Sequence, residues 1–218
     1  GMKGTYQVET YDKFKEEVST CSHLEELAQK CHIIFFCLPT PMRQNGSCDI
    51  RILKNEIIKF DKICEERNYK NRIAIIKSTV IPGTTNLIDD RCKNIDVIFS
   101  PEFLTEANHI ADFKNQTRII VGGKRPASSK VKNMFRKAFP QTPIVKTSST
   151  IAETVKYFIN CFLATKVIFA NEMYQICQGL DIDYDKVTEY ALYDKRIGRS
   201  HLSVPGPDGD LGYGGHCF

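Results

Sequence analysis

The sequence predicts an α/β fold: a Rossmann-like, mostly parallel sheet with helices on both faces, followed by a long helix and the start of a helical central domain. Short β-rich runs alternate with helical stretches over the first two thirds of the chain, which favours a parallel sheet. Two of the runs, Ile33–Phe36 and Ile73–Ile76, are continuously apolar, as strands covered on both faces are. Residues 151–178 contain neither Gly nor Pro, which predicts one long helix.

The strands are expected where β-branched and aromatic residues cluster between turn residues. A helix is expected after Asp49, an N-cap residue type, because apolar positions then recur at helical spacing. The expected strands are Tyr6–Tyr11, Ile33–Leu38, Ile73–Ile76, Val97–Phe99, Ile119–Val121 and a weaker Ile144–Val145; the apolar helix positions are Ile52, Leu53, Ile57, Phe60 and Ile63.

Thr150 and Glu153 have the spacing of a capping box at the start of the long helix, and Gly179 supplies its stop. Such a helix is roughly 40 Å long at 1.5 Å per residue, longer than a compact domain needs. We therefore expect it to form a spine or a dimer contact. A short helix is expected over Asp183–Leu192. The predicted domains are a Rossmann-like domain over residues 1–147 and a long-helix region over residues 148–218.

Composition narrows the class of protein. With 42% hydrophobic residues in 218, the chain can bury a sizeable core, and its net charge of +4 contains no run of like charges that indicates nucleic acid. No membrane segment or targeting segment is expected, which predicts a soluble, cytoplasmic protein. No metal site is expected either. The nine cysteines are scattered and odd in number, as reduced thiols are. Cys37 and Cys161 lie in apolar segments, where a thiol is usually buried.

The last fifteen residues carry the first candidate site. Gly212, Gly214 and Gly215 allow backbone amides to approach a phosphate or an oxyanion closely, and Cys217 beside them offers a nucleophilic thiol. The alternative is a C-terminal tail with an incidental cysteine, and the segment alone leaves both interpretations open.

The segment Ser100–Glu106 follows a predicted strand, where ligands of open α/β sheets bind. If it is helical, Glu102 and Glu106 share one face, and a carboxylate there can act as a general base. The alternative is an acidic helix start stabilised by the macrodipole. Lys156 and Asn160, four apart on the long helix, either face solvent or offer a cation and an amide to an oxyanion.

Two further strand ends, Leu38–Pro41 and Lys77–Thr84, carry hydroxyls and glycine that suit a dinucleotide lying across the sheet. Asp12 ends the first predicted strand, as an acidic residue does where it binds a ribose. Each of these segments taken singly is also an ordinary turn.

Together these segments resemble the nucleotide-sugar 6-dehydrogenase family, and most closely its UDP-glucose type, over nearly the whole chain. The motifs occur in the family's order: LPTP, KSTVIPGTT, SPEFLTEA followed by Asp112-Phe113, KYFINCFLATK, NEM, DKRIG and GYGGHCF.

The resemblance implies oxidation of a sugar C6 alcohol to the carboxylate with two NAD, and a homodimer built on the long helix. It implies that Cys217 forms a thiohemiacetal and then a thioester. Glu102 is implied as the base for hydrolysis of that thioester, with Lys156, Asn160 and Thr79 orienting water and stabilising oxyanions.

The resemblance also implies the binding residues. The implied NAD site comprises Asp12, Leu38, Pro39, Thr40, Pro41, Met42, Ser78, Thr79, Val80 and Glu106. The implied nucleotide-sugar site comprises Glu102, Phe103, Leu104, Glu106, Lys156, Asn160, Arg196, Gly212, Tyr213, Gly214 and Gly215.

The sequence departs from the family at both ends. No strand with a G-x-G-x-x-G turn precedes Tyr6, and the chain ends at Phe218, before the family's C-terminal nucleotide-binding domain. These departures favour one alternative, a truncated, non-catalytic homologue acting as a binding or oligomerisation module. A second alternative is an NAD-dependent dehydrogenase of the hydroxyacid type, which needs neither the thiol loop nor SPEFL.

Overall fold

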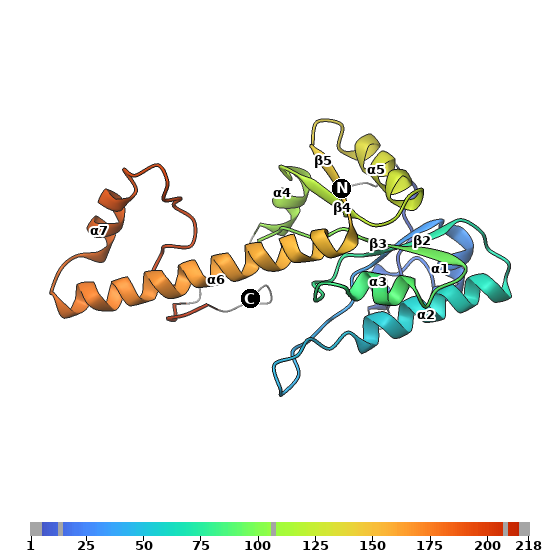
Figure 1. Cartoon of the computed structure of the whole chain (residues 1–218), viewed down its shortest axis with the longest axis horizontal. Coiled ribbons are helices and arrows are strands. Elements are labelled where there is room, and N and C mark those ends of the chain that lie inside the picture. The colour runs from blue at the N-terminus through green and yellow to red at the C-terminus, as the bar shows by residue number, and fades with distance from the viewer. Residues whose placement is uncertain (1–5, 13–14, 106–107, 207–208, 214–218) are drawn as a thin grey trace. The chain divides into compact units, whose positions relative to one another are not determined.

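The chain, in a computed structural model, forms two compact units, residues 1–156 and 157–218. The structure describes residues 6–12, 15–105, 108–206 and 209–213. The first unit contains a five-stranded sheet in the order β1-β2-β3-β4-β5 (Figure 1). Every neighbouring pair is parallel except β3 and β4. The strands are β1 (Ile33–Phe36), β2 (Arg72–Ile76), β3 (Ile95–Phe99), β4 (Ile119–Gly122) and β5 (Ile144–Thr147).

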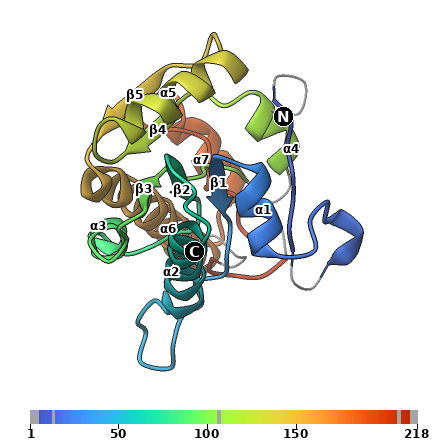
Figure 2. The same cartoon turned by 90° about the vertical axis from the view of Figure 1, so that its right-hand side faces the viewer.

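Helices cover both faces of this sheet, as the continuously apolar strands predict. Helices α1, α2 and α3 pack on one face, and α5 packs on the other; Figure 2 shows α2 and α5 on opposite sides of the strands. The helices of this unit are α1 (Leu24–Lys30), α2 (Arg51–Glu66), α3 (Thr84–Asp89), α4 (His109–Lys114) and α5 (Ala127–Ala138), with a 3-10 turn, η2, at Glu16–Val18.

Alternate residues of each strand feed two separate cores. Ile34, Phe36 and Ile76 pack with Leu53, Ile57 and Phe60 of α2, whereas Ile73 and Ile75 pack with Val131 and Phe135 of α5. Because a strand's side chains alternate between its faces, a sheet with two covered faces needs apolar residues at every position. The Rossmann-like, mostly parallel architecture is thereby confirmed.

The helix expected after Asp49 is α2, with one difference. Leu53, Ile57, Phe60 and Ile63 are buried, but Ile52 is 47% exposed. At 100° per residue, Ile52 and Leu53 cannot both face the sheet, and the stripe that starts at Leu53 is the longer one. Asp49 accepts the Arg51 backbone N–H at 3.0 Å and lies one residue ahead of the N-cap.

The strand expected at Tyr6–Tyr11 does not form, because described residues 6–11 have no ladder with the sheet. Their polar backbone groups bond to a nearby loop instead. The Thr10 carbonyl accepts the N–H groups of Thr20 and Cys21, at 2.9 and 3.0 Å, and Thr20 Oγ1 accepts the Thr10 N–H at 2.8 Å. The backbone groups of Thr10 are therefore hydrogen-bonded within this loop region, without pairing to a strand.

The long helix, α6, spans Ser149–Gly179, but the capping box expected at its start is wrong. Ser148 supplies the cap, because its Oγ accepts the Ile151 N–H at 3.3 Å. Glu153 is fully buried and bonds to the segment that begins α3. The first turns of α6 press against β4, since a Cβ on Gly122 would lie 2.7 Å from that of Ala152.

The second unit contains the rest of α6 and the short helix α7 (Tyr184–Ala191), which confirms the helix expected there. Asp183 caps α7 by accepting the Asp185 N–H at 2.9 Å. Tyr174 of α6 meets Tyr184 edge to face, with ring centroids 5.5 Å apart. Among the described residues, no helix combines the length and apolar character needed to cross a membrane.

The two cysteines expected to be buried, Cys37 and Cys161, are both exposed. Cys37 follows the last residue of β1, where the strand leaves the sheet, and Cys161 lies on an uncovered part of α6 within its unit. An apolar sequence neighbourhood does not distinguish the two sides of a helix, which explains the wrong prediction for Cys161.

Candidate active site

The carboxyl ends of three adjacent parallel strands form the centre of the candidate site. In the strand register, Phe36 of β1 pairs with Ile76 of β2, and Ile76 pairs with Phe99 of β3. The next residues, Cys37, Lys77 and Ser100, therefore leave the sheet at one level, which is where ligands bind in open α/β sheets.

An ion pair joins two of these strand ends. Lys77 Nζ lies 3.0 Å from Glu102 Oε2, and it also donates to the Pro101 carbonyl at 3.3 Å. The two side chains are only 13% and 27% exposed. Glu102 Oε1 accepts the Phe103 backbone N–H at 3.3 Å, so both carboxylate oxygens have a donor. The carboxylate predicted as a base is thus held in a defined position.

The backbone around Glu102 forms neither a helix nor a strand, so the helical interpretation of this stretch is wrong. Residues 101–105 have no helical hydrogen bonds, and Glu106 lies outside the described residues. Thr105 instead donates through its N–H and its Oγ1 to Asp112 Oδ2, at 2.8 and 2.5 Å. The Thr105 side-chain bond lowers the pKa of Asp112 from its usual value. The loop that carries Glu102 is therefore tied down at both ends.

Two cations pack on the aromatic ring of Phe103. The Arg118 guanidinium carbon is 4.3 Å from the Phe103 ring centroid, and Lys156 Nζ is 5.4 Å from it, both within cation–π range. Lys156 is 8% exposed, which excludes the solvated alternative for that lysine. Glu102 and Lys156, far apart in sequence, therefore meet the same aromatic residue.

Most of the predicted NAD residues directly follow β1 and β2. Ser78 Oγ accepts the Leu38 N–H at 3.0 Å and donates to the Leu38 carbonyl at 2.6 Å. Thr40 Oγ1 donates to the Thr79 carbonyl at 2.8 Å. These bonds clamp the two strand ends together.

Beside this clamp, Pro39, Pro41 and Met42 are exposed, while Val80 is buried beneath it. Exposed apolar side chains on a rigid strand crest suit a planar ring lying across the sheet, so the residues present fit that part of a dinucleotide. Asp12 is half-buried, and its N–H donates to Ser19 Oγ at 2.8 Å. Because the strand expected before Asp12 is not formed, its assignment to the ribose stays a sequence-based prediction.

Most of the remaining predicted residues belong to the second unit. Arg196 is exposed and forms a bidentate pair with Asp194, and Asn160 is half-buried one turn along α6 from Lys156. Gly212 donates its N–H to Asn171 Oδ1 at 3.0 Å, and the neighbouring Tyr213 is exposed. Leu104, in the first unit, is half-buried. Cys217, Gly214 and Gly215 lie outside the described residues.

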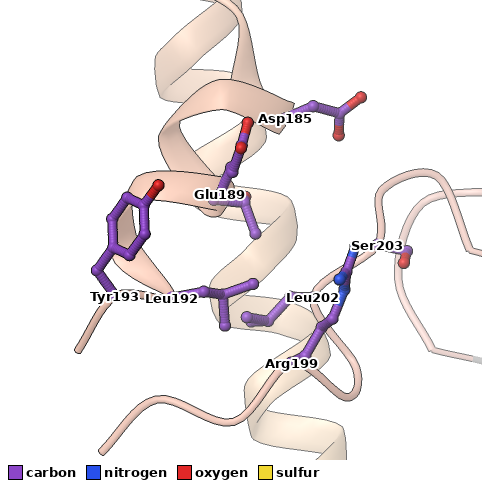
Figure 3. A pocket seen from close by; sticks show the side chains of 8 residues that line it. Asp185, Glu189, Leu192, Tyr193, Arg199, Leu202 and Ser203 are labelled. Atoms are coloured by element: carbon purple, nitrogen blue, oxygen red, sulfur yellow. The ribbon is translucent and has the colours of Figure 1, made fainter. Parts of the chain in front are cut away.

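A separate pocket of about 560 Å³ lies within the second unit, between α7 and the segment that follows it (Figure 3). Asp185, Glu189 and Tyr193 line one side, and Arg199 and Ser203 line the other. Among the described residues, its lining contains none of the predicted site side chains. We therefore place the candidate site at the strand ends of the first unit.

Sequence reasoning missed two residues that organise this site, and one in the second unit. Lys77 pairs with Glu102, and Arg118 packs on Phe103. In the second unit, Asn171, 7% exposed, accepts the Gly212 N–H. Lys77 and Asn171 lie inside motifs that were recognised, KSTV and NEM, so their positions carried a signal. Arg118 lies in no such motif, and only the three-dimensional packing identifies it.

Comparison with known proteins agrees with this arrangement. Residues 8–139 match the NAD-binding domain of the UDP-glucose/GDP-mannose dehydrogenase family, and residues 150–218 match its central domain. A UDP-glucose 6-dehydrogenase of Rickettsia bellii is 34% identical over 212 residues, covering 93% of this chain and 46% of its own length. The UDP-glucose 6-dehydrogenase TuaD of Bacillus subtilis is 32% identical, covering 85% of this chain and 40% of its own length.

The fold also matches solved structures. A UDP-glucose dehydrogenase from Pyrobaculum islandicum superimposes with a TM-score of 0.81 at 31% identity, covering 91% of this chain and 46% of that one. This chain spans less than half the length of these relatives. Since two adjacent models of one family account for most of its residues, the chain belongs to the UDP-glucose/GDP-mannose dehydrogenase family, through both its NAD-binding and its central domain.

Proposed function

We propose that this protein oxidises the C6 alcohol of a nucleotide sugar, UDP-glucose, to the carboxylate, with NAD as the oxidant and Cys217 as the nucleophile. The observation that carries the proposal is that Glu102 and Lys156 both contact Phe103, beyond the strand ends: Glu102 Oε1 accepts the Phe103 N–H, and Lys156 Nζ lies over the Phe103 ring. An acid–base reaction through oxyanions requires a carboxylate and a mostly buried ammonium, and both are present around this residue.

NAD, when bound, supplies a hydride acceptor for both oxidations. Leu38, Pro39, Thr40, Pro41 and Met42 would hold it across the crest, with Ser78, Thr79 and Val80 from the neighbouring strand end. The clamp between Ser78 and Leu38 keeps that surface rigid. Asp12 and Glu106 are proposed as further cofactor contacts on the family resemblance alone.

The Cys217 thiol divides the second oxidation into two easier steps. Its sulfur bonds to C6 of the aldehyde, and the thiol proton ends on the new hydroxyl. Loss of a hydride and of the hydroxyl proton leaves a thioester. Water then forms a C–O bond to C6, the C–S bond breaks, and the thiol is regenerated.

The other residues stabilise charge during these steps. Glu102 takes a proton from the attacking water, and Lys156 and Asn160 donate hydrogen bonds to the oxyanions. Thr79 is proposed to orient the water. Phe103, Leu104, Arg196 and the glycine loop from Gly212 are proposed to hold the nucleotide sugar.

A homodimer through α6 is part of the proposal. Phe162, Phe169 and Ile176 are 58%, 61% and 51% exposed within this chain. They recur every seven residues, so they lie close to one stripe of the helix, as residues at a helix–helix contact do. A cytoplasmic location stays a prediction from the cysteine pattern.

The test is the stoichiometry of NADH formed when the protein is mixed with NAD and a limiting amount of UDP-glucose. The proposal predicts two NADH per sugar and a uronate product. Cys217→Ser should release aldehyde or stall, whereas Cys161→Ser, which removes an exposed thiol elsewhere, should behave as the unmodified protein does.

Full turnover to the uronate by Cys217→Ser would contradict the thioester step. Calorimetry separates the remaining alternatives. Tight binding of UDP-glucose with no NADH would favour a binding module, and oxidation of a hydroxyacid in place of the sugar would favour the other dehydrogenase class.

A further inference from the structure

Lys77 is the charged residue at the strand ends to which the proposed chemistry gives no role. Its backbone continues the ladder of the sheet, because its N–H donates to the Phe36 carbonyl at 3.0 Å. Its side chain is 13% exposed and ends 3.0 Å from Glu102 Oε2. Because the Lys77 backbone is fixed and its side chain is mostly buried, few other positions are open to the ammonium group.

Hydrogen bonds in the segment that carries Glu102 also hold this ion pair in place. Lys77 Nζ donates to the carbonyl of Pro101, the residue next to Glu102, at 3.3 Å. The N–H of Ser100, two residues before Glu102, donates to the Ile76 carbonyl at 3.0 Å. Lys77 and the loop of Glu102 are therefore joined through both backbone and side chain, which is more than a surface ion pair provides.

The neighbouring ionisable groups do not compete for Lys77. Although Cys37 is exposed as a residue, the protein around its thiol partly desolvates it and raises its pKa; Lys77 opposes this and Glu102 adds to it. A neutral thiol offers Lys77 no charge at neutral pH. The other nearby cations, Arg118 and Lys156, lie against the Phe103 ring. Lys77 is thus the cation within ion-pair distance of Glu102 in the described part of the site.

We propose that Lys77 is a positioning residue, which orients the Glu102 carboxylate so that it can accept a proton from water. The proposal rests on the proposed function for the identity of the reaction, although not for the ion pair itself. A general base must lie within hydrogen-bond reach of the proton that it takes, and the Lys77 ammonium holds one of the two Glu102 carboxylate oxygens in place.

The step that Lys77 assists is hydrolysis of the thioester. As the water oxygen bonds to C6, a water proton moves to Glu102, and the sulfur leaves with the electrons of the C–S bond. Lys77 donates to Oε2 and the Phe103 N–H donates to Oε1, so each oxygen keeps a lone pair for water. The lysine itself transfers no proton.

The first experiment needs no turnover. It compares where the Glu102 carboxylate lies in the unmodified protein and in variants of Lys77. In Lys77→Met the Glu102 carboxylate should leave the position that it has in the unmodified protein, as compared by crystal structures of the two. Lys77→Arg should keep the carboxylate in place, and Lys59→Met, which removes an exposed lysine of α2, should leave its position unchanged.

The second experiment measures hydrolysis where the unmodified protein forms NADH. Lys77→Met should release uronate at least about tenfold more slowly at neutral pH, with the KM for UDP-glucose little changed, and Lys77→Arg should recover most of the rate. Lys77→Gln serves if the methionine variant does not fold. A Glu102 carboxylate that keeps its position without Lys77 overturns the proposal, as does an unchanged kcat in Lys77→Met. Absence of NADH with the unmodified protein contradicts the proposed function instead, and the crystal structures still decide the role of Lys77.

Discussion

Glu153, a fully buried carboxylate on α6, accepts two hydrogen bonds from Thr85 of α3, 68 residues away in sequence. The Thr85 N–H donates to Oε1 at 2.7 Å, and the Thr85 hydroxyl donates to the same oxygen at 2.6 Å. Oε2 accepts the N–H of Gly83, whose φ of 97° favours glycine, at 2.6 Å. A charge buried inside the unit is thus satisfied by the free amides at the start of a helix.

Replacing Glu153 by Ala should lower the free energy of unfolding by about 3 kcal/mol or more, because buried donors lose a charged acceptor. Urea denaturation measures this loss. Glu172→Ala, which removes an exposed carboxylate from the same helix, should change the free energy by less than about 0.5 kcal/mol. Equal effects of the two substitutions would show that Glu153 does not hold α3 in place.

The cysteines should differ widely in reactivity. Burial, then the carboxylates of Asp61 and Asp89, raise the pKa of Cys92 to about 12, and burial raises that of Cys64 to about 11. Because the thiolate is the reactive form, neither should be alkylated by iodoacetamide at pH 8 within the time that labels exposed Cys161. Peptide mass spectrometry of the native protein measures the rates, and rapid labelling of Cys92 would contradict its burial.

The stability of the second unit should fall as the solution becomes acidic. Burial, then the nearby Lys166, lower the pKa of His201, so this imidazole stays neutral in the fold after the unfolded chain has taken up a proton. Its contribution is therefore complete above about pH 6.5, the unfolded value, and is lost as the pH falls toward the folded value.

The variant His201→Asn should lose less stability between pH 7.5 and 5.5, because Asn does not titrate. Asn also tolerates the φ of 64° found at His201. Thermal unfolding at pH 7.5 and 5.5 compares it with the unmodified protein. His32→Asn, at an exposed position, should preserve the original slope. An unchanged slope in His201→Asn would assign the dependence to other groups.

The proposed dimer predicts a change of mass on charging the α6 stripe. Phe162→Glu combined with Phe169→Glu should convert a dimer to a monomer in sedimentation equilibrium, because each would place a carboxylate in an apolar contact. Tyr193→Glu, at a 78% exposed position after α7, is the matched control and should leave the mass unchanged. A monomeric unmodified protein would contradict the dimer proposal directly.

Much of the fold was predictable because its signals are local. The strands around Ile34 and Ile75 are apolar at every position, and the long helix is free of breakers until Gly179. The strand expected at Tyr6–Tyr11 was not predictable in this way. Pairing depends on a partner distant in sequence, and here the Thr10 carbonyl found one in the loop at Thr20.

The site was predictable at the level of residue types and less so at the level of contacts. Glu102 was recognised from its place after a strand, yet its neighbour Lys77 follows a different strand and meets it only through sheet register. Glu153 shows the same limit. Its spacing from Thr150 matched a local cap, while the donors that satisfy it belong to α3. Local patterns cannot rank a partner three residues away against one seventy residues away.

The proposed oxidation proceeds through a covalent bond to Cys217. The mass of the peptide that contains this residue tests that bond most directly. Glu102→Gln keeps the shape of the base and removes its ability to take a proton, so NAD and UDP-glucose should acylate Cys217 and leave the adduct unhydrolysed. Acid-quenched protein should show the added mass on the peptide containing Cys217, and only when NAD is present. Absence of an adduct while NADH is formed, or an adduct confined to another cysteine, would contradict the account.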